Sequence, residues 1–427
     1  MARVGVVGAG YVGLATGAVL AHLGHRVTCG DIDAERVRRL RQGQVPIREA
    51  GLEDLVREGL GNGRLAFVHG AAEAVVEAEF VFLCVPTPQE EDGAADMSYV
   101  QRAATEIAPE LAAECVVVNK STVPVGSTHV VERALGRDDV AVVSNPEFLR
   151  EGSAVHDCLN PDRIVIGAED QAAAMRAASL FRSLKAPLVI TDPASAETIK
   201  YASNAFLATK VSFVNALANV CEALGADVSD VVLGMGYDPR IGFEFLKPGP
   251  GWGGSCLPKD TRAMVRIAED AGYDFGLLRG VITVNDDQYE RMADKVEAMA
   301  GGSLGGTTVA AWGLTFKART DDLRGSPAIE VIRRLEARGA RVRAYDPAVA
   351  GGAPVLAGTE VVSDPYAACE GADVLVVLTE WDELRWCDLA KVAGLMSTPR
   401  IVDTRNLLDA ATVRRRGFTY DGLGRCR

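Results

Sequence analysis

Cys256 stands in a stretch of unusual composition, GWGGSCLPKD at residues 251–260. The glycines before it remove side chains from the backbone, which permits a ligand to approach closely. Pro258 suits a first helical turn, so Cys256 is expected at a helix N-terminus. That position, with Lys259 nearby, favours the thiolate, the form that attacks carbonyl carbons. We therefore predict that Cys256 is a nucleophile, whereas the other cysteines are expected to be small buried hydrophobic residues.

A glycine loop, GAGYVG at residues 8–13, fits the pattern G-x-G-x-x-G. It follows an apolar segment typical of a strand and precedes an Ala- and Leu-rich segment typical of a helix. Asp31 stands 18 residues after Gly13, at the end of the next predicted strand, where an acid binds the ribose hydroxyls of NAD. The glycines would bring N–H groups to the pyrophosphate, and the carboxylate would repel the extra phosphate of NADP. NAD is therefore the predicted cofactor.

Two further residues, Lys200 and Asn204, are four apart on a predicted long helix and so share one face. An ammonium and an amide placed together could stabilise an oxyanion or assist proton transfer. By itself this pair is also typical of a solvated helix face, so the spacing leaves both interpretations open.

Reactive side chains also occur in two loops, NKSTVPVGST at 119–128 and NPEFLREGSA at 145–154. Each follows a predicted strand at its carboxyl end, where doubly wound sheets bind ligands. The candidates are Thr122, Glu147 and Glu151, and Glu147 is expected to act as a base for water.

The elements that must position these residues form two alternating patterns of strand and helix. Strands are predicted at 3–7, 26–31, 78–85, 114–121 and 140–145, and again at 308–313, 341–347, 372–381 and 400–406. Between the two patterns, a run from Ala196 of nearly thirty residues without Gly or Pro predicts one long helix. Further helices are expected at 259–271 and 277–299, before a glycine-rich boundary at 300–306.

This arrangement predicts an α/β fold with two Rossmann-like doubly wound parallel-sheet domains joined by a long central helix. The expected domains are an NAD-binding domain at 1–195, a helical dimerisation region at 196–300 and a second Rossmann-like domain at 301–427. The second Rossmann-like domain lacks the glycine fingerprint and has AWGLTFK at 311–317 in its place. We expect it to hold a nucleotide-bearing substrate.

The composition is typical of a globular enzyme, with 427 residues, 48% of them hydrophobic and 24% charged. A formal net charge of -13 disfavours binding to nucleic acid or anionic membranes. The start of the chain has no signal-peptide plan and no apolar run long enough to cross a membrane, so a cytoplasmic protein is expected. Nine scattered cysteines with no zinc-like spacing predict neither disulfides nor a metal site.

A nucleophilic thiol together with an NAD site indicates more than a simple alcohol dehydrogenase. The thiolate can trap an aldehyde as a thiohemiacetal, and a second oxidation then yields a thioester that water hydrolyses. We therefore predict a four-electron oxidation of a primary alcohol to a carboxylate.

These features, with CVPTP at 84–88, STVPVGST at 121–128, KYASN at 200–204 and GLTFKARTDDLRGSP at 313–327, resemble the UDP-glucose/GDP-mannose dehydrogenase family. The resemblance covers nearly the whole chain. It implies a catalytic set of Cys256, Lys200, Asn204, Asp260, Glu147 and Thr122. It implies NAD contacts from Gly8, Gly10, Tyr11, Val12, Gly13, Asp31, Arg36, Val85, Pro86, Thr87, Ser121, Thr122, Glu151, Lys259 and Arg324.

The resemblance also implies a nucleotide-sugar substrate and a homodimer or higher homo-oligomer. The implied sugar-nucleotide contacts are Glu147, Phe148, Leu149, Arg150, Glu151, Lys200, Asn204, Phe245, Lys247, Gly249, Gly253, Phe316, Lys317 and Arg405, with Arg240 reaching across from a partner subunit. UDP-glucose is the expected substrate, oxidised to UDP-glucuronate, and GDP-mannose is the alternative because its dehydrogenases share G-G-S-C-L-P-K-D. Two other classes remain open: a single-hydride dehydrogenase of the 6-phosphogluconate or hydroxyacid type, and a non-catalytic NAD-binding regulator.

Overall fold

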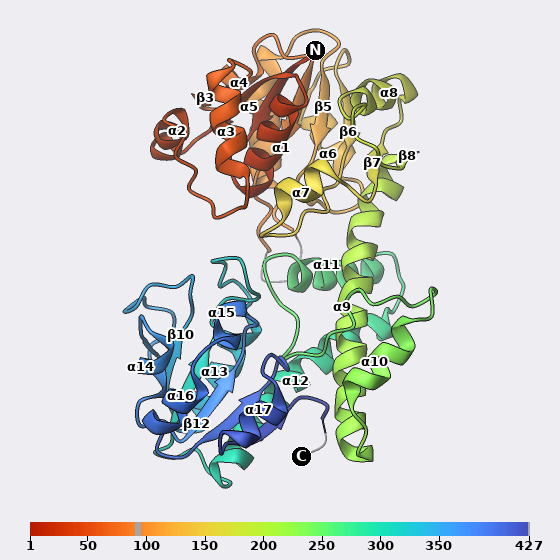
Figure 1. Cartoon of the computed structure of the whole chain (residues 1–427). Helices are drawn as coiled ribbons and strands as arrows, with labels where there is room; N and C mark the ends of the chain where they lie inside the picture. The colour runs from red at the N-terminus through yellow and green to blue at the C-terminus, as the bar shows by residue number, and fades with distance from the viewer. Residues whose placement is uncertain (90–94, 426–427) are drawn as a thin grey trace. The chain divides into compact units, whose positions relative to one another are not determined.

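The computed structural model describes residues 1–89 and 95–425 (Figure 1). The chain divides into two compact units, Met1–Ser203 and Asn204–Arg427. The division falls inside the longest helix, α9, which runs without interruption from Pro193 to Leu224. This helix confirms the predicted long helix and begins slightly earlier, because a proline is well suited to a first helical position.

The first unit is built on an eight-stranded sheet in the order β3-β2-β1-β4-β5-β6-β7-β8. Neighbouring strands are parallel except β6 and β7, which meet antiparallel. Central strands are apolar runs such as VVVN in β5, buried throughout because helices cover both faces. The strands are β1 Arg3–Val7, β2 Arg26–Asp31, β3 Leu65–His69, β4 Phe80–Leu83, β5 Val116–Asn119, β6 Ala141–Ser144, β7 Ile164–Gly167 and β8 Leu188–Thr191.

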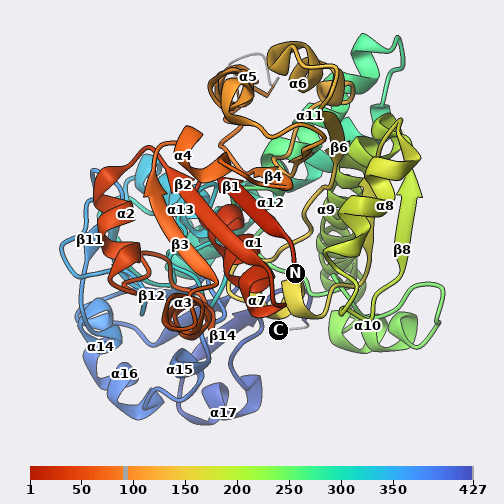
Figure 2. The ribbon, with the colours of Figure 1, turned by 90° about the horizontal axis from the view of Figure 1, so that it is seen from above.

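Helices cover this sheet on both sides (Figure 2). Their buried residues form two apolar layers against the sheet. One layer contains buried residues of α1, α2, α3, α7 and α8, and the other contains buried residues of α4, α5 and α6. The helices are α1 Tyr11–His22, α2 Ala34–Arg41, α3 Leu52–Gly61, α4 Ala72–Val75, α5 Ser98–Ile107, α6 Ser127–Leu135, α7 Ala154–Leu159 and α8 Gln171–Ser179, with a 3₁₀ turn at Ala108–Glu110.

The second unit contains a six-stranded parallel sheet in the order β11-β10-β9-β12-β13-β14. Buried residues of α12 and α13 pack on one face, and those of α14 to α17 pack on the other. The strands are β9 Thr308–Trp312, β10 Arg341–Tyr345, β11 Glu360–Val361, β12 Val374–Val377, β13 Arg400–Asp403 and β14 Thr419–Gly422. The helices are α10 Val228–Gly236, α11 Leu257–Asp270, α12 Gly276–Ala300, α13 Pro327–Ala337, α14 Pro365–Cys369, α15 Asp382–Arg385, α16 Leu389–Leu395 and α17 Ala410–Arg415.

The predicted fold class is confirmed: two Rossmann-like parallel sheets and a long helix between them along the chain. α11 and α12 also confirm the helices predicted at 259–271 and 277–299. The antiparallel junction between β6 and β7 was not predicted. The division into three domains stays a prediction. None of the helices in the described residues is long and apolar enough to cross a membrane.

Candidate functional site

The glycine loop lies between β1 and α1 and has the form that a dinucleotide requires. Gly8 has φ +96°, and a Cβ built on Gly13 would lie 1.9 Å from the Gly8 carbonyl oxygen. By contrast, a Cβ built on Gly10 would meet no heavy atom of the described residues within 4 Å. No residue in the described first turn of α1 is acidic. Because the N-terminus of a helix favours anions, this open and unencumbered loop fits the pyrophosphate of NAD.

Asp31 ends β2 and faces the same loop. Its Oδ2 accepts hydrogen bonds from the Ala9 N–H at 2.8 Å and from Arg36 Nη1 at 3.0 Å. Only 5% of the Asp31 side chain is exposed, whereas 38% of the Arg36 side chain is exposed. The structure therefore brings together the loop, the acid and the arginine that the sequence assigns to NAD, and a carboxylate at this place fits a ribose with free hydroxyls.

Two segments at the carboxyl ends of β4 and β5 are joined by hydrogen bonds. Ser121 Oγ donates to the Val85 carbonyl at 2.8 Å, and Thr87 Oγ1 donates to the Thr122 carbonyl at 2.7 Å. Pro86 lies between the two bonded residues of the first segment. The structure thus places all the candidates of these two loops at one edge of the sheet, the edge where doubly wound folds bind ligands.

Glu147 and Lys200 form a buried ion pair in the first unit. Lys200 Nζ lies 2.8 Å from Glu147 Oε1, and the two side chains are 5% and 6% exposed. Glu147 Oε2 accepts a hydrogen bond of 2.7 Å from the Leu149 N–H. Burial opposes ionisation of this carboxyl, but the charge and hydrogen bond of Lys200 outweigh it and hold the pKa of Glu147 below its ordinary value. Glu147 is therefore a carboxylate at neutral pH.

The loop that follows Glu147 is held by charged side chains of the same unit. The Arg163 guanidinium lies over the Phe148 ring, 3.6 Å from its centroid. Arg150 pairs with Asp157, with 2.5 Å between Nη2 and Oδ1. These contacts set the course of residues 148–151, which the sequence assigns to the nucleotide sugar and NAD.

The same loop is tied to the start of α1 through one acid. The Tyr11 hydroxyl donates to Glu49, and Glu49 Oε2 also accepts a hydrogen bond of 2.8 Å from the Gly152 N–H. Burial, followed by the hydrogen bond with Glu49, raises the pKa of Tyr11 well above its usual range. The predicted cofactor loop and the loop at 145–154 are therefore parts of one connected structure.

Cys256 is the N-cap residue of α11 in the second unit, as predicted from its sequence context. Its side chain is partly exposed, and Sγ lies 3.6 Å from Ser255 Oγ. Pro258 occupies the first turn of α11. None of the eight cysteines that the structure describes forms a disulfide.

Asp260, in the first turn of α11, is completely buried and lies at the centre of a polar cluster. Its Oδ2 accepts a hydrogen bond of 2.6 Å from Asn204 Nδ2, and its Oδ1 lies 2.8 Å from Lys259 Nζ. Asn204 comes from α9, one helical turn after Lys200. The structure thus joins three of the predicted site residues in one hydrogen-bonded group.

The cysteine loop packs against two other segments of the second unit. A Cβ built on Gly253 would lie 1.9 Å from the Gly325 carbonyl oxygen, and one built on Gly249 would lie 3.0 Å from Arg405 Nη1. Arg405 also donates to the Phe316 carbonyl at 3.3 Å. Gly249, Phe316 and Arg405 are therefore neighbours, although they are spread over more than 150 positions of the sequence, and Gly253 is a neighbour of Gly325.

Other candidates of the second unit lie toward solvent. Arg240 is exposed and pairs with Asp238, with 2.5 Å between Nη2 and Oδ2. Arg324 is exposed and pairs with Asp322 at 2.7 Å, and Lys247 is exposed as well. Arg240 and Arg324 are thus each described in an ion pair with a nearby aspartate.

Two more candidates, Phe245 and Lys317, lie in loops of the second unit. Phe245 has φ +62°, which is unusual for a bulky residue, and residues in strained conformations cluster at functional sites. Lys317 Nζ lies 5.3 Å from the centroid of the Phe316 ring. Both fit a role at a loop-built site.

Comparison with known proteins decides the family. Three models of the UDP-glucose/GDP-mannose dehydrogenase family match the chain: the NAD binding domain at residues 2–185, the central domain at 194–287 and the UDP binding domain at 310–410. The chain belongs to this family. It is an NAD-dependent nucleotide-sugar dehydrogenase.

Individual relatives of this dehydrogenase match over nearly their whole length. A UDP-glucose 6-dehydrogenase of Rhizobium meliloti is 46% identical over 99% of both chains. One of Pseudomonas aeruginosa is 46% identical over 100% of this chain and 98% of the relative. Among solved structures, a UDP-glucose dehydrogenase from the hyperthermophilic archaeon Pyrobaculum islandicum has a TM-score of 0.91 and 38% identity, and the match covers 100% of this chain and 98% of that one.

Lys120 is a residue of the dehydrogenase that sequence reasoning missed. Its side chain is buried, and Nζ donates to Asn145 Oδ1 at 3.1 Å. Its charge contributes to the lowered pKa of Glu147. The signal was present, because Lys120 directly precedes Ser121 and Thr122 in a motif that was singled out for those two residues.

Glu197 was also missed. It is 2% exposed, and its carboxylate accepts hydrogen bonds from the Gly126 N–H at 2.6 Å and the Thr128 N–H at 2.9 Å. Burial raises the pKa of Glu197, although these N–H groups act against the rise. Glu197 stands three residues before Lys200 and therefore on the same face of α9, which could have identified it. It holds the loop that carries Thr122.

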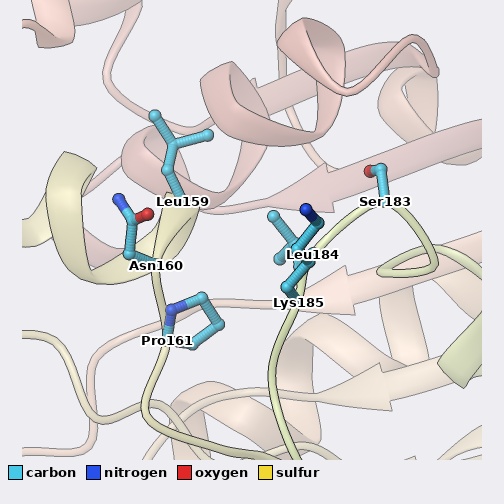
Figure 3. Close-up of a pocket in the computed structure, with 6 residues that line it drawn as sticks. All are labelled: Leu159, Asn160, Pro161, Ser183, Leu184 and Lys185. Atoms are coloured by element: carbon cyan, nitrogen blue, oxygen red, sulfur yellow. The ribbon is translucent and has the colours of Figure 1, made fainter.

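The described residues contain a surface hollow of about 330 Å³, lined by Leu159, Asn160, Pro161, Ser183, Leu184 and Lys185 (Figure 3). None of the predicted site residues lines it, so the hollow is separate from the chemistry described above. No group of three or more His, Cys, Asp or Glu side chains in the described part of the chain is placed to hold a metal ion.

Proposed function

We propose that the chain is a UDP-glucose 6-dehydrogenase, which oxidises C6 of UDP-glucose to the carboxylate of UDP-glucuronate and reduces two NAD per sugar. The observation that carries the proposal is Cys256 at the N-terminus of α11, in a glycine-lined loop, in a chain whose first unit fits NAD. A simple alcohol dehydrogenase has no use for a nucleophilic thiol, whereas a thiol allows oxidation to continue to the acid. The two bacterial relatives carry this activity in their names.

Cys256 would form the covalent intermediates. The thiolate attacks the aldehyde carbon, so that the new S–C bond holds the carbon first as a thiohemiacetal and, after oxidation, as a thioester. NAD, when bound, accepts two electrons from the sugar carbon in each of the two oxidations. Attack of water on the thioester carbon then breaks the S–C bond, which restores the thiolate and releases the carboxylate.

Glu147 would take the proton from the attacking water, which Thr122 would help to hold. A carboxylate with a lowered pKa is ionised at neutral pH, but it is a weak base while Lys200 neutralises it. If the Lys200 ammonium turns to the oxyanion of the tetrahedral intermediate, it no longer neutralises the Glu147 carboxylate. Glu147 then becomes a stronger base at the step in which water attacks the thioester.

Asn204 would share the stabilisation of the oxyanion. An asparagine amide has two N–H donors, and Asp260 accepts only one of them, over the 2.6 Å bond to Nδ2. Asp260 would therefore fix the amide so that its second N–H faces the reacting oxygen. The NAD and nucleotide-sugar contacts assigned from the sequence complete the proposal.

A homodimer would form through the exposed apolar face of α9. Phe206, Phe213 and Val220 recur at intervals of seven residues and are 65%, 54% and 50% exposed, and Leu224 is 77% exposed. A seven-residue interval places side chains on one helix face, and so wide an apolar stripe is expected to be covered. This supports a dimerisation role for the region at 196–300, with Arg240 reaching the partner's substrate. We also propose a cytoplasmic location.

The function is tested by NADH production with UDP-glucose, GDP-mannose and UDP-N-acetylmannosamine, compared side by side with limiting sugar. We expect two NADH per UDP-glucose and much slower turnover of the other two. One NADH per sugar would identify a single-hydride dehydrogenase, and a preference for GDP-mannose would replace the substrate. Tight NAD binding without turnover of any nucleotide sugar would indicate a non-catalytic regulator.

A further inference from the structure

The backbone from Gly249 to Gly253, just before Cys256, belongs to no helix or strand. Its peptide groups are nevertheless buried, and buried N–H and C=O groups need partners. For Gly249 and Trp252 these partners are side chains of α9 and α12, all in the second unit. These side chains are 0% to 7% exposed, and they are Ser212, Asn215, Asn285, Gln288 and Tyr289.

Asn285 binds both polar groups of one loop residue. Its Oδ1 accepts a hydrogen bond of 2.8 Å from the Trp252 N–H, and its Nδ2 donates to the Trp252 carbonyl at 3.1 Å. Tyr289 adds a hydroxyl that donates to the same carbonyl at 2.8 Å. The Trp252 indole N–H donates to Ser212 Oγ at 2.8 Å. Every polar group of Trp252 is therefore held by helix side chains.

Gly249 is held in the same way, three residues earlier. Its N–H donates to Asn215 Oδ1 at 2.8 Å, and its carbonyl accepts from Gln288 Nε2 at 2.9 Å. Asn219 Nδ2 donates to Gln288 Oε1 at 3.1 Å, which fixes the orientation of the glutamine amide. Side chains of α9 and α12 thus hold the loop at Gly249 and at Trp252, both of which precede Cys256 in the chain.

Between the two clamped residues, Gly251 has φ +139°, and a Cβ built there would lie 2.4 Å from the Tyr289 ring. Only glycine fits such a position without strain. The path of the loop toward Cys256 therefore depends on side chains of α9 and α12 and requires glycine at residue 251.

We propose that Asn285, with Tyr289 and Gln288, is a positioning residue that sets the place of the Cys256 thiol for attack on the sugar carbon. The inference rests on the proposed function of Cys256. Reacting atoms must lie about 3–3.5 Å apart, and a displacement of about 1 Å costs on the order of a hundredfold in rate. None of these helix residues was singled out by the sequence.

The test compares Asn285→Ala, Asn285→Asp and Tyr289→Phe with a control, Trp312→Phe. Trp312 is a fully buried residue of the same unit, and its indole N–H donates to the Pro365 carbonyl at 3.0 Å. The control therefore loses a buried hydrogen bond of similar kind in the sheet. Asp at 285 keeps the acceptor for the Trp252 N–H but lacks the donor for its carbonyl.

We expect Asn285→Ala to lower kcat by about tenfold to a hundredfold, Asn285→Asp by nearly as much, and Tyr289→Phe by less, because Asn285 still holds the carbonyl. The rate of inactivation by iodoacetamide, which reports the environment of Cys256 without substrate, should change at least about threefold in Asn285→Ala. KM for NAD should stay within about twofold, and Trp312→Phe should lose thermal stability while keeping kcat.

A wild-type kcat and alkylation rate in folded Asn285→Ala would overturn the proposal, as would an equal loss of kcat in Trp312→Phe at equal stability. If Asn285→Ala does not fold, Tyr289→Phe decides by the same two readouts. Failure of the proposed function would appear differently: wild-type protein would make no NADH from UDP-glucose, while the alkylation rates would still report the position of the thiol.

Discussion

Asp31 and Asp346 stand at the ends of β2 and β10, at corresponding places in two sheets whose strands run in the same order, β3-β2-β1-β4 and β11-β10-β9-β12. Both carboxylates accept backbone N–H groups from the turn after the preceding central strand. Asp31 accepts from Ala9 at 2.8 Å, and Asp346 accepts from Leu314 at 2.8 Å. The two units therefore share the order of these strands and an acid at the same place in that order.

The surroundings of the two acids differ. Asp346 Oδ2 also accepts from the Thr315 hydroxyl at 3.0 Å and from the Trp381 indole at 3.1 Å. In the first unit the matching partner is Arg36, a half-exposed side chain at the rim. No helix follows directly after β9, since β9 ends at Trp312 and α13 begins at Pro327.

The comparison teaches that strand order does not determine which unit binds a dinucleotide. An acid can accept ribose hydroxyls only if its oxygens are reachable, and a pyrophosphate needs a helix N-terminus next to an open glycine turn. In the first unit a helix begins next to an open glycine turn, and the acid pairs with the partly exposed Arg36. In the second unit the acid is bound by the buried Trp381, and the helix starts later. This agrees with the family assignment of an NAD binding domain to one unit and a UDP binding domain to the other.

The largest expected effect is a loss of kcat when the nucleophile Cys256 is replaced, without a change in NAD binding by the first unit. Cys256→Ala should lower kcat by at least about a thousandfold, because the covalent route is lost. The Kd of NAD, measured by fluorescence titration, should stay unchanged, since the first unit is untouched. Cys387→Ala, at a partly exposed cysteine of the second unit, should keep full activity. Cys256→Ser should stall or hold an ester, and full turnover by either Cys256 variant would refute the assignment.

The buried ion pair of the first unit should give the next largest effect. Lys200→Met should lower kcat by about a hundredfold, as is usual for loss of a group that stabilises an oxyanion. It also leaves Glu147 buried without its counter-charge, so the pKa of the carboxyl should rise and the acid limb of the pH–kcat profile should move to higher pH. Lys210→Met, on the same helix, is the control, and an unmoved acid limb would contradict the pairing.

The pH dependence of the free energy of unfolding should also depend on the Glu147–Lys200 pair. In the wild type the pKa of Glu147 is lowered in the folded state, so its stabilising contribution is present above the unfolded value of about 4.3 and is lost as the pH falls through the folded value. In Lys200→Met burial raises the folded pKa, so stability should instead fall as the pH rises through the new value. Urea unfolding at a series of pH values measures this change of sign.

Two glycine substitutions test whether the turns after β1 and β9 differ in their role in NAD binding. A Cβ at Gly13 would lie 1.9 Å from the Gly8 carbonyl, and one at Gly313 would lie 2.4 Å from Thr379. Gly13→Ala should raise the Kd of NAD on the order of tenfold, or ~1.4 kcal/mol. Gly313→Ala should lower thermal stability and leave the Kd within twofold. Equal effects of both on NAD binding would break the comparison.

The smallest expected effect on NAD binding comes from substitution of the two acids, Asp31 and Asp346. Asp31→Asn should weaken NAD binding by about fivefold, because a charged acceptor for the ribose is lost. Asp346→Asn should leave NAD binding unchanged but lower the free energy of unfolding by about 1.5–3 kcal/mol, since four N–H and O–H groups donate to one oxygen of its carboxylate. Calorimetry and NAD titration of both variants separate the two roles.

Much of this was open to sequence reasoning, because local pattern determines local structure. Apolar runs specified nine of the strands in the part of the chain that the structure describes, whereas β3, β7, β8, β11 and β14 were not predicted. The run from Ala196 specified the long helix, and the glycine loop with Asp31 identified the cofactor. Cys256 stood out because its neighbours were glycines, a proline and charges rather than apolar residues. In each case the evidence lies within a few residues of the site, where spacing alone carries the physical information.

Only the tertiary structure decided which polar residues are buried. The local sequence does not distinguish four of these buried residues from those of a solvated helix or loop: Asn285, Gln288, Glu197 and Lys120. Their importance comes from their burial and from the hydrogen bonds that they make there, and burial depends on segments far away in the sequence. Asp346 shows the same limit, since nothing near it in the sequence reveals that Trp381 covers it. Local pattern determines an element, whereas the contacts between elements determine what a polar side chain does.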